Sequence, residues 1–308
     1  MGSNLPFSTL CKKVGLTPSL KRRRLREWLV SLPTLVWLSL FLVIPTLLVF
    51  AIAFRPANPY GGIGPGWTLE TVRGLLDEGY LVIAWRTVWI SLVTTAVCLL
   101  LAVPTGYFIA RASVAWRNRL LMLVIVPFWT SFLVRVFAWK SLLHPEGLIK
   151  KVLEACGLAA AQSTLLYHPS AVVLVMVYTF LPFTILPIYA AAEKFDFRLL
   201  EAARDLGARP FQAFRKIFLP GIRRGLLTAV LVVFIPALGS YIIPDIVGGP
   251  ASEMLGNKIA QRVFVDRNLP QAAALSALLI LAVLAPLVAV LVLQRKKDKP
   301  DIIIGEAP

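Results

Sequence analysis

Charged residues, histidine and cysteine are scarce in this sequence of 308 residues. Only 16% of the residues are charged and 58% are hydrophobic, with a mean hydropathy of +0.76. A soluble domain, in contrast, is about a quarter charged and about half apolar. This composition excludes a soluble enzyme, a secreted disulfide scaffold and a disordered chain. The apolar residues are grouped in long blocks, which is typical of a protein that lies in a lipid bilayer.

The few sulfur and imidazole side chains indicate no metal or redox site. The three cysteines, Cys11, Cys98 and Cys156, have no close spacing, so they indicate neither a disulfide framework nor a metal pattern. The two histidines, His144 and His168, lie in the same loop as Cys156, and a zinc site there would need further ligands. We therefore predict no metal ion on this chain.

Six apolar segments are long enough to cross a membrane, since a spanning helix needs about 20 residues. They are 29–54, 87–110, 120–139, 171–192, 225–243 and 272–293. They contain no Asp or Glu, and Arg135 is the only charged residue within them. Because the backbone must satisfy its own hydrogen bonds in lipid, the predicted fold class is an all-α membrane protein with six transmembrane helices. The first segment is too long for a signal peptide and predicts an uncleaved anchor.

Basic residues are distributed unevenly between the two sides of these spans. Of the 32 Lys and Arg residues, 22 lie in segments 1–28, 111–119, 193–224 and 294–308, and nine lie in the loops on the opposite side. The excess predicts that both termini are cytoplasmic, and it accounts for the net charge of +16 without nucleic acid. The predicted organisation is a basic cytoplasmic segment (1–28), a six-helix transmembrane domain (29–293) and a cytoplasmic tail (294–308).

The cytoplasmic loop 193–224 has the pattern of a compact docking element. Leu199–Leu206 predicts a short helix, and Gly207 is a suitable residue to end it. Pro210 suits the first turn of a second, amphipathic helix, which Pro220 is expected to end. The residues predicted to share one face of this second helix are Phe211, Phe214 and Phe218.

The same loop resembles the EAA loop in permease subunits of binding-protein-dependent ABC importers. The resemblance rests on Glu201-Ala202-Ala203, on Gly207 after three further residues, and on Ile217-x-Leu219-Pro220 after nine more. It implies a type I ABC importer permease fold in the bacterial plasma (inner) membrane, with these residues coupling the permease to an ATPase. A closing ATPase pair would then push this loop and reorient the spans between two states.

The resemblance also implies the partners of the chain. These are a second permease subunit, a cytoplasmic ABC ATPase dimer that binds ATP and magnesium, and an external or periplasmic solute-binding protein. No cofactor and no catalytic residue are predicted on this chain, which lacks the G-x-x-x-x-G-K-[ST] motif. An intramembrane enzyme is disfavoured because no H-E-x-x-H or G-x-S-x-G motif occurs. A stand-alone carrier or channel is disfavoured because only Arg135 is charged within the spans.

Three further segments, 127–135, 181–187 and 236–250, resemble the polyamine branch of these permeases. They imply spermidine or putrescine as the solute. The alternative is another small solute, such as an opine or amino-acid conjugate, iron or an anion, because related branches share parts of these motifs. A polycation favours aromatic faces and carboxylates along its pathway. The candidate pathway residues are Trp129, Arg135, Tyr178, Tyr241 and Asp245.

Each of these five residues has a structural alternative. The aromatic side chains could pack in the core or form an interfacial belt. Asp245 could be a solvated turn carboxylate. Arg135 could extend to the outer interface, pair with an acid on the partner subunit, or pair with Asp245.

Overall fold

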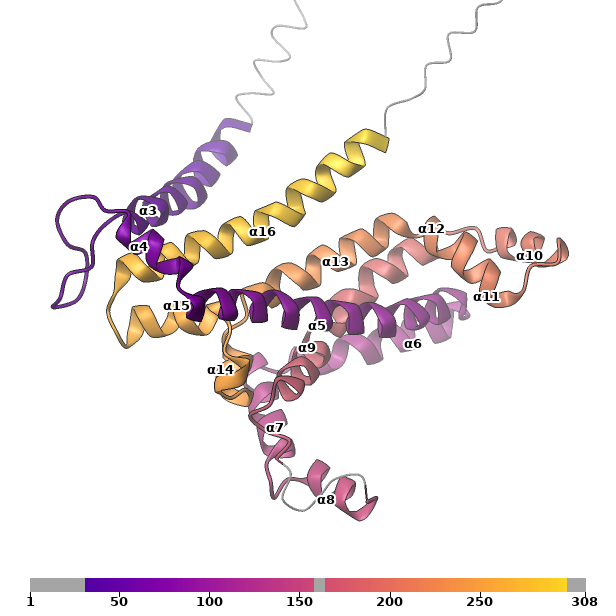
Figure 1. Ribbon diagram of the computed structural model, residues 1–308. Coiled ribbons are helices and arrows are strands. Elements are labelled where there is room, and N and C mark those ends of the chain that lie inside the picture. Colours follow the sequence, from indigo (N-terminus) through magenta and orange to yellow (C-terminus); the bar gives the residue numbers. More distant parts are fainter. Residues whose placement is uncertain (1–30, 158–163, 298–308) are drawn as a thin grey trace, which may run out of the picture. The chain divides into compact units, whose positions relative to one another are not determined.

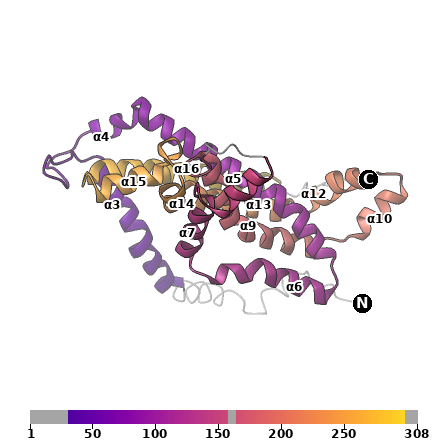
Figure 2. The same ribbon diagram turned by 90° about the horizontal axis from the view of Figure 1, so that it is seen from below.

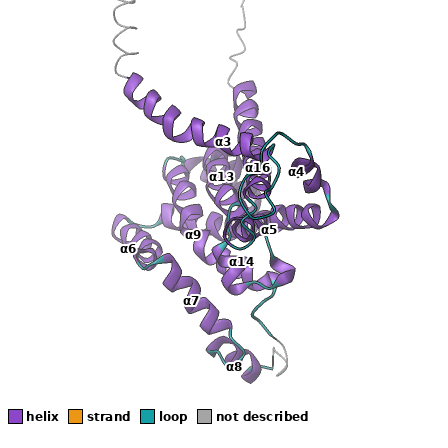
Figure 3. Ribbon diagram, turned by 90° about the vertical axis from the view of Figure 1, so that its left-hand side faces the viewer, coloured by secondary structure: helices purple, strands orange, loops and turns teal. Residues whose placement is uncertain are grey.

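The computed structural model describes residues 31–157 and 164–297, and every regular element among them is helical (Figure 3). One isolated β-bridge joins Ala57 and Ile63. The predicted all-α fold is therefore confirmed for these residues. The predicted basic segment 1–28 and the tail beyond residue 297 lie outside the described residues.

The chain divides into two compact units, Met1–Ile52 and Ala53–Pro308. The described part of the first unit belongs to a helix that begins at Ser31, ends at Ala53 and has a mean hydropathy of 2.7. This helix includes a π-helical turn, η1 (Ser39–Val43), followed by α3 (Ile44–Ala53). Its length and apolar composition agree with the first predicted span.

Three helices pack together in the second unit: α5 (Glu78–Arg111), α9 (Pro169–Glu193) and α13 (Arg223–Leu238) (Figure 1). A small residue brings α5 and α9 close together, because a Cβ atom on Gly106 would lie only 2.8 Å from Cγ2 of Ile188. Small residues at helix crossings permit this kind of close approach in membrane proteins.

Helix α13 approaches α9 even more closely. A Cβ atom on Gly225 would lie 2.3 Å from Cβ of Ala191 and 2.9 Å from the carbonyl oxygen of Pro187. Just before α13, a Cβ atom on Gly221 would lie 2.4 Å from the ring of Phe195. These positions have no room for a larger side chain, so Gly225 permits the packing of α13 against α9 and Gly221 permits the packing of the chain before α13 against Phe195.

The predicted span over 120–139 is wrong as a single helix. Helix α6 (Val114–Ile125) leads into the 3-10 turn η3 (Val126–Trp129), and α7 (Phe132–Leu143) begins after extended residues. The two arms of this broken helix are bent by 89° (Figure 2). Pro127 has no N–H to donate to the helical ladder, and the Thr130 hydroxyl donates to its carbonyl at 2.8 Å. The break therefore follows from the proline and from the local hydrogen bond that replaces the regular turn.

The predicted span over 225–243 is also interrupted. Helix α13 ends at Leu238, three irregular residues follow, and α14 (Ile242–Val247) is a separate short helix. Gly239 stands at the end of α13, where its high backbone freedom favours a helix terminus. The C-terminal end of this predicted span is therefore a short helix of its own.

The remaining elements are shorter, except for α16 (Leu269–Lys297). They are α4 (Glu70–Arg73), η2 (Gly74–Leu76), α8 (Leu148–Ala155), α10 (Arg198–Asp205), α11 (Pro210–Ala213), η4 (Phe214–Phe218), α12 (Leu219–Gly221), η5 (Pro250–Ser252) and α15 (Leu255–Phe264). Within the second unit, α10–α12 lie at the Arg111 end of α5, whereas α4 and α15 lie near its Glu78 end (Figures 1 and 2).

Three helices of the described residues are long and apolar enough to span a membrane. The number rises to as many as five if each of two bent pairs counts as one span, Val114–Trp129 with Phe132–Ala155 and Pro210–Gly221 with Arg223–Leu238. The three single helices are Ser31–Ala53, Glu78–Arg111 and Pro169–Glu193, and a shorter apolar helix covers Leu269–Ala285. The total of six spans and the cytoplasmic location of the termini remain predictions.

Hydrogen bonds tie the start of α5 to residues far along the chain. The Arg262 guanidinium and the Gln271 amide both donate to the hydroxyl oxygen of Tyr80, at 2.6 and 2.7 Å. The Arg86 guanidinium donates to the carbonyl oxygen of Pro250 at 2.9 Å. We call this set of contacts the outer network. It holds α5 against α15 and α16 at the end away from loop 193–224.

Candidate functional site

The loop 193–224 forms two short helices that meet at Gly207. After α10 the chain turns back, and the N–H of Ala208 donates to the carbonyl of Ala203 at 3.0 Å. Gly207 has a φ of +87°, a conformation that only glycine adopts readily. The predicted role of Gly207 as the helix stop is therefore confirmed.

The second helix begins at Pro210, as predicted, and continues from α11 through the π turn η4 into α12. The prediction that Pro220 ends this helix is wrong, because α12 includes Pro220 and ends at Gly221. The N–H of Leu219 closes the π turn by donating to the carbonyl of Phe214. Pro220 then lies in the first turn of a new helical segment, where a missing N–H is tolerated.

Five aromatic side chains pack between this loop and the end of α5. We call this group the aromatic clamp; its members are Tyr107, Phe195, Phe197, Phe214 and Phe218. The ring of Tyr107 lies edge-on to three of them, with centroids 5.8 Å from Phe197, 5.3 Å from Phe214 and 4.9 Å from Phe218. Phe195 is 5.5 Å from Phe197 and 5.3 Å from Phe218. These separations and tilts are those of favourable aromatic pairs.

The predicted phenylalanine stripe holds for two of its three members. Phe218 is fully buried and Phe214 is half-buried in the clamp, but Phe211 is 71% exposed. The second helix is interrupted by the π turn, which changes the angular spacing of side chains along it. Phe211 therefore projects away from the rings of Phe214 and Phe218.

The residues that carry the EAA resemblance divide into an exposed set and a half-buried set. The exposed set is Glu201, Ala202, Gly207 and Pro220, and the half-buried set is Ala203, Ile217 and Leu219. The half-buried residues pack against the core that contains the clamp. The exposed set presents a small side chain beside a carboxylate, so a partner surface has room to approach the loop backbone.

A second cluster surrounds Arg135 on α7. Its guanidinium carbon lies 4.3 Å from the ring centroid of Phe128, which precedes the break between η3 and α7. The Phe128 ring is 6.1 Å from Tyr178 and 6.0 Å from Phe183, and Tyr178 is 5.3 Å from Trp139. The Nη1 atom of Arg135 is buried and has no hydrogen-bond partner among the described residues. The face of Phe128 is therefore a stabilising contact for this cation.

The structure brings only part of the predicted pathway set together. Arg135 and Tyr178 share the cluster, whereas Trp129 is 80% exposed and has no ring contact within the described chain. Tyr241 and Asp245 lie at the start of α14, where the N–H of Asp245 donates to the carbonyl of Tyr241 at 3.0 Å. No ion pair joins Asp245 to Arg135 in the part of the chain that the structure describes.

Sequence reasoning did not identify Phe128, Phe183 and Trp139 as members of this cluster. Phe128 and Arg135 lie on opposite sides of a break that ordinary helical spacing does not reveal. The available signal was Pro127 inside an apolar run, because a proline there predicts an irregular turn. No group of three or more His, Cys, Asp or Glu residues able to hold a metal ion occurs within residues 31–157 and 164–297.

We expect Arg135 and Phe128 to be energetically coupled in a double-mutant cycle. Phe128→Leu removes the ring and leaves a desolvated cation, whereas Arg135→Met removes the cation itself. The double variant should therefore be less destabilised than the sum of the two single variants, with a coupling of about 0.5–2 kcal/mol. Thermal unfolding of the purified complex measures each variant, and additive effects would contradict this arrangement.

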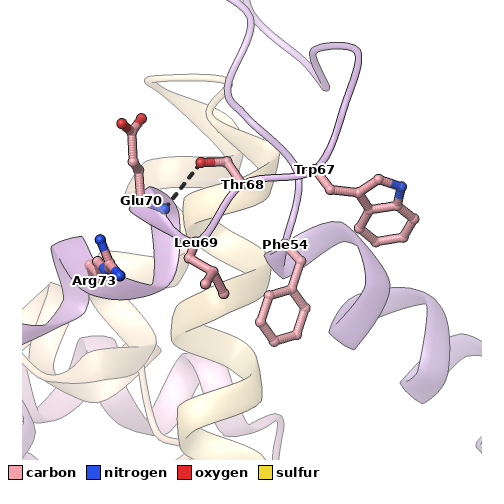
Figure 4. A pocket seen from close by; sticks show the side chains of 6 residues that line it. All are labelled: Phe54, Trp67, Thr68, Leu69, Glu70 and Arg73. Carbon is pink, nitrogen blue, oxygen red and sulfur yellow. Dashed lines mark hydrogen bonds between the residues drawn. The ribbon is translucent and has the colours of Figure 1, made fainter.

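An open pocket of about 650 Å³ lies in the segment before α5. Figure 4 shows Leu69 and Phe54 between Trp67 and the charged side chains of Glu70 and Arg73. The Thr68 hydroxyl accepts a hydrogen bond from the N–H of Glu70 at 3.1 Å and so steadies the start of α4 (Figure 4). The pocket is apolar on one side and charged on the other, and it lies at the end of α5 opposite to the aromatic clamp.

Residues 102–298 match the family described as "Binding-protein-dependent transport system inner membrane component". The spermidine/putrescine transport system permease protein PotB of Haemophilus influenzae is 36% identical over 240 residues, covering 78% of this chain and 84% of the relative. PotB of Escherichia coli K12 is 35% identical, covering 78% of this chain and 87% of the relative. The inner membrane ABC transporter permease protein YdcU of E. coli K12 is 32% identical, covering 69% and 71% respectively.

Two solved structures share the fold at low sequence identity. A crystal structure of a bacterial ABC transporter that imports alginate matches with a TM-score of 0.67 and 18% identity over 91% of this chain and 100% of that chain. A bacterial alginate ABC transporter in complex with a pentasaccharide-bound periplasmic protein matches with a TM-score of 0.71 and 17% identity, covering 92% and 98%. The chain is thus an inner-membrane protein with several spanning helices, and it belongs to the family of ABC importer permeases, which are transport proteins rather than enzymes.

Proposed function

We propose that this chain and a second permease subunit enclose the pathway by which an ABC importer moves polyamines, such as spermidine and putrescine, into the cell. An external solute-binding protein supplies the solute, and a cytoplasmic ATPase dimer that binds ATP and magnesium drives the cycle. This chain holds no cofactor. The observation that carries the proposal is the 35–36% identity, over 78% of the chain, to relatives named as spermidine/putrescine permeases.

The coupling role is supported by loop 193–224. Its exposed residues include Glu201 and Ala202, while its inner side is fixed to α5 through Tyr107. An ATPase surface that grips the exposed side would therefore act on a loop that is already attached to a long apolar helix. In this proposal the coupling residues are Glu201, Ala202, Ala203, Gly207, Ile217, Leu219 and Pro220.

The pathway part of the proposal rests on the cluster around Arg135. The rings of Phe128, Tyr178 and Trp139 offer faces on which cations bind, as the guanidinium of Arg135 does on the face of Phe128. Arg135 itself would repel a polyamine, and the six predicted spans contain no acid. We therefore propose that the second permease supplies the carboxylates and that Trp129, Tyr241 and Asp245 line the pathway in the assembled pair.

The proposed topology keeps both termini in the cytoplasm and six spans in the membrane. Segment 29–293 is the transmembrane domain, with 1–28 and 294–308 as cytoplasmic ends. The broken helix of α6, η3 and α7 then counts as one span, and α13 begins another after the coupling loop. Backbone breaks of this kind are tolerated at membrane depth where protein or water covers them.

Transport by the complete complex tests the solute assignment. The chain is reconstituted in proteoliposomes with its second permease, its ATPase and its binding protein, and uptake of labelled spermidine and putrescine is measured with ATP and with a non-hydrolysable analogue. We expect uptake that requires hydrolysable ATP and every partner. ATP-dependent uptake of an anion, an iron complex or an amino-acid conjugate instead would replace the solute and keep the importer. Uptake by this chain alone would contradict the importer mechanism.

A further inference from the structure

We propose that Tyr107 is the positioning residue that joins the coupling loop to α5, so that loop and helix move together when the ATPase subunits close. The proposal rests on the proposed function, since it concerns how movement of loop 193–224 reaches the membrane helices. The EAA resemblance identifies the residues that face the ATPase and says nothing about Tyr107, which belongs to a different helix.

A single ring on α5 contacts both arms of the loop. Phe197 comes before α10, whereas Phe214 and Phe218 come after the turn at Gly207, and all three rings lie within 5.8 Å of the Tyr107 centroid. The interplanar angles are 69°, 85° and 80°, so each contact is edge-to-face. The residues on both sides of the turn at Gly207 therefore contact the same side chain, that of Tyr107.

The orientation of this ring is fixed from the side of α5. The Arg111 guanidinium donates to the hydroxyl oxygen of Tyr107 at 2.8 Å, and it also lies 5.8 Å from the centroid of Phe197. Arg111 is one helical turn after Tyr107, so the two side chains lie on the same face of α5. The hydroxyl contact thus holds the ring between the arms of the loop.

Helix α5 is in turn fixed against α9 at the same level. A Cβ atom on Gly106, the residue before Tyr107, would lie 2.8 Å from Cγ2 of Ile188 and 3.3 Å from the backbone nitrogen of Tyr189. Packing this close resists sliding of one helix past the other. A displacement of the loop that reaches Tyr107 is therefore passed to α5 and α9 together.

The neighbouring residue Phe108 offers a matched control. Phe108 is 67% exposed and is not a member of the clamp. Removing its ring deletes a similar aromatic side chain from the same turn of α5 without affecting the loop. Tyr107→Phe removes only the hydroxyl and separates ring packing from the hydrogen bond to Arg111.

The test uses the complete complex in proteoliposomes and measures solute uptake and ATP hydrolysis on equal amounts of assembled transporter. For Tyr107→Ala we expect ATP hydrolysis to persist while uptake per ATP falls about tenfold, which is a typical loss of coupling between two sites. Tyr107→Phe should give an intermediate ratio, because the ring packing stays and the hydrogen bond from Arg111 is lost. Phe108→Ala should keep the wild-type ratio. If uptake and hydrolysis fall together in Tyr107→Ala, or if the ratio is unchanged, the positioning role is overturned.

A distance measurement keeps the proposal testable if Tyr107→Ala does not assemble. Spin labels at Phe108 and Arg209, both exposed, report the separation of α5 and the loop in the otherwise wild-type complex. We expect this distance to stay the same with and without an ATP analogue, and a change would overturn the proposal. The ratio of uptake to ATP hydrolysis can be measured with any solute that the wild type imports, and the spin-label distance needs no solute. Failure of the wild type to import polyamines would therefore contradict the solute assignment without affecting the test of Tyr107.

Discussion

Replacing Gly225 by valine is expected to remove most of the folded protein from the membrane. The Cβ atom of any larger residue at this position would lie 2.3 Å from Cβ of Ala191 and 2.9 Å from the carbonyl oxygen of Pro187. The second obstacle is backbone, so the clash cannot be relieved by a change of rotamer. Overpacking a well-packed site costs about 1–3 kcal/mol, and backbone clashes cost more.

The measurement is the yield of monodisperse complex and its unfolding temperature, which we expect to fall by about 5–10 °C. Gly239→Ala is the matched control at the other end of α13, where the nearest atom to an added Cβ is the Pro236 carbonyl oxygen at 3.9 Å. The backbone there has a φ of −86°, which alanine adopts without strain. Wild-type yield and unfolding temperature for Gly225→Val would show that α9 and α13 do not pack as described.

Gly207→Val is expected to abolish most transport while leaving the fold in place. No atom lies within 4 Å of an added Cβ, so the site has space and the effect is on the backbone alone. At a φ of +87° a β-branched residue is strained, and left-handed conformations cost L-residues about 1–2 kcal/mol. That cost lowers the equilibrium constant for the docking-competent turn about tenfold, and we expect uptake to fall by up to the same factor.

Gly157 provides a control, because it also has a positive φ but lies outside loop 193–224. It follows α8, has a φ of +69°, and likewise has no atom within 4 Å of an added Cβ. Gly157→Val should therefore carry a similar conformational strain and yet transport at close to the wild-type rate. If both variants transport equally well, or if both lose transport to the same extent, the turn at Gly207 has no special part in coupling.

Local sequence signals predicted the helices of loop 193–224 better than the helices around it. Gly207 and Pro210 act on the chain within one or two residues of themselves, so their effects are visible without tertiary structure. The breaks after Trp129 and Leu238 also depend on local residues, but hydropathy over a long window averages across them. Apolar composition predicted which segments are apolar enough to span a bilayer and did not reveal where their helices bend.

The two aromatic groups could not be predicted, because each depends on how separate helices pack. Tyr107 belongs to an apolar segment that reads as an ordinary span, and only the packing of α5 under the loop brings it to Phe214. In the same way Phe128 and Arg135 meet because the helix between them is broken. Sequence patterns report which face of one helix is apolar, whereas these sites are defined by contacts between elements.

The outer network has a consequence for the order in which the protein is made. Tyr80 is joined to Arg262 and Gln271, 182 and 191 residues further along the chain, and Arg86 is joined to Pro250, 164 residues further on. A ribosome has therefore synthesised nearly the whole polypeptide before these bonds can form. Until then the end of α5 near Tyr80 lacks its partners. A nascent permease that stalls before residue 250 should accordingly be a preferred target for membrane quality-control proteases.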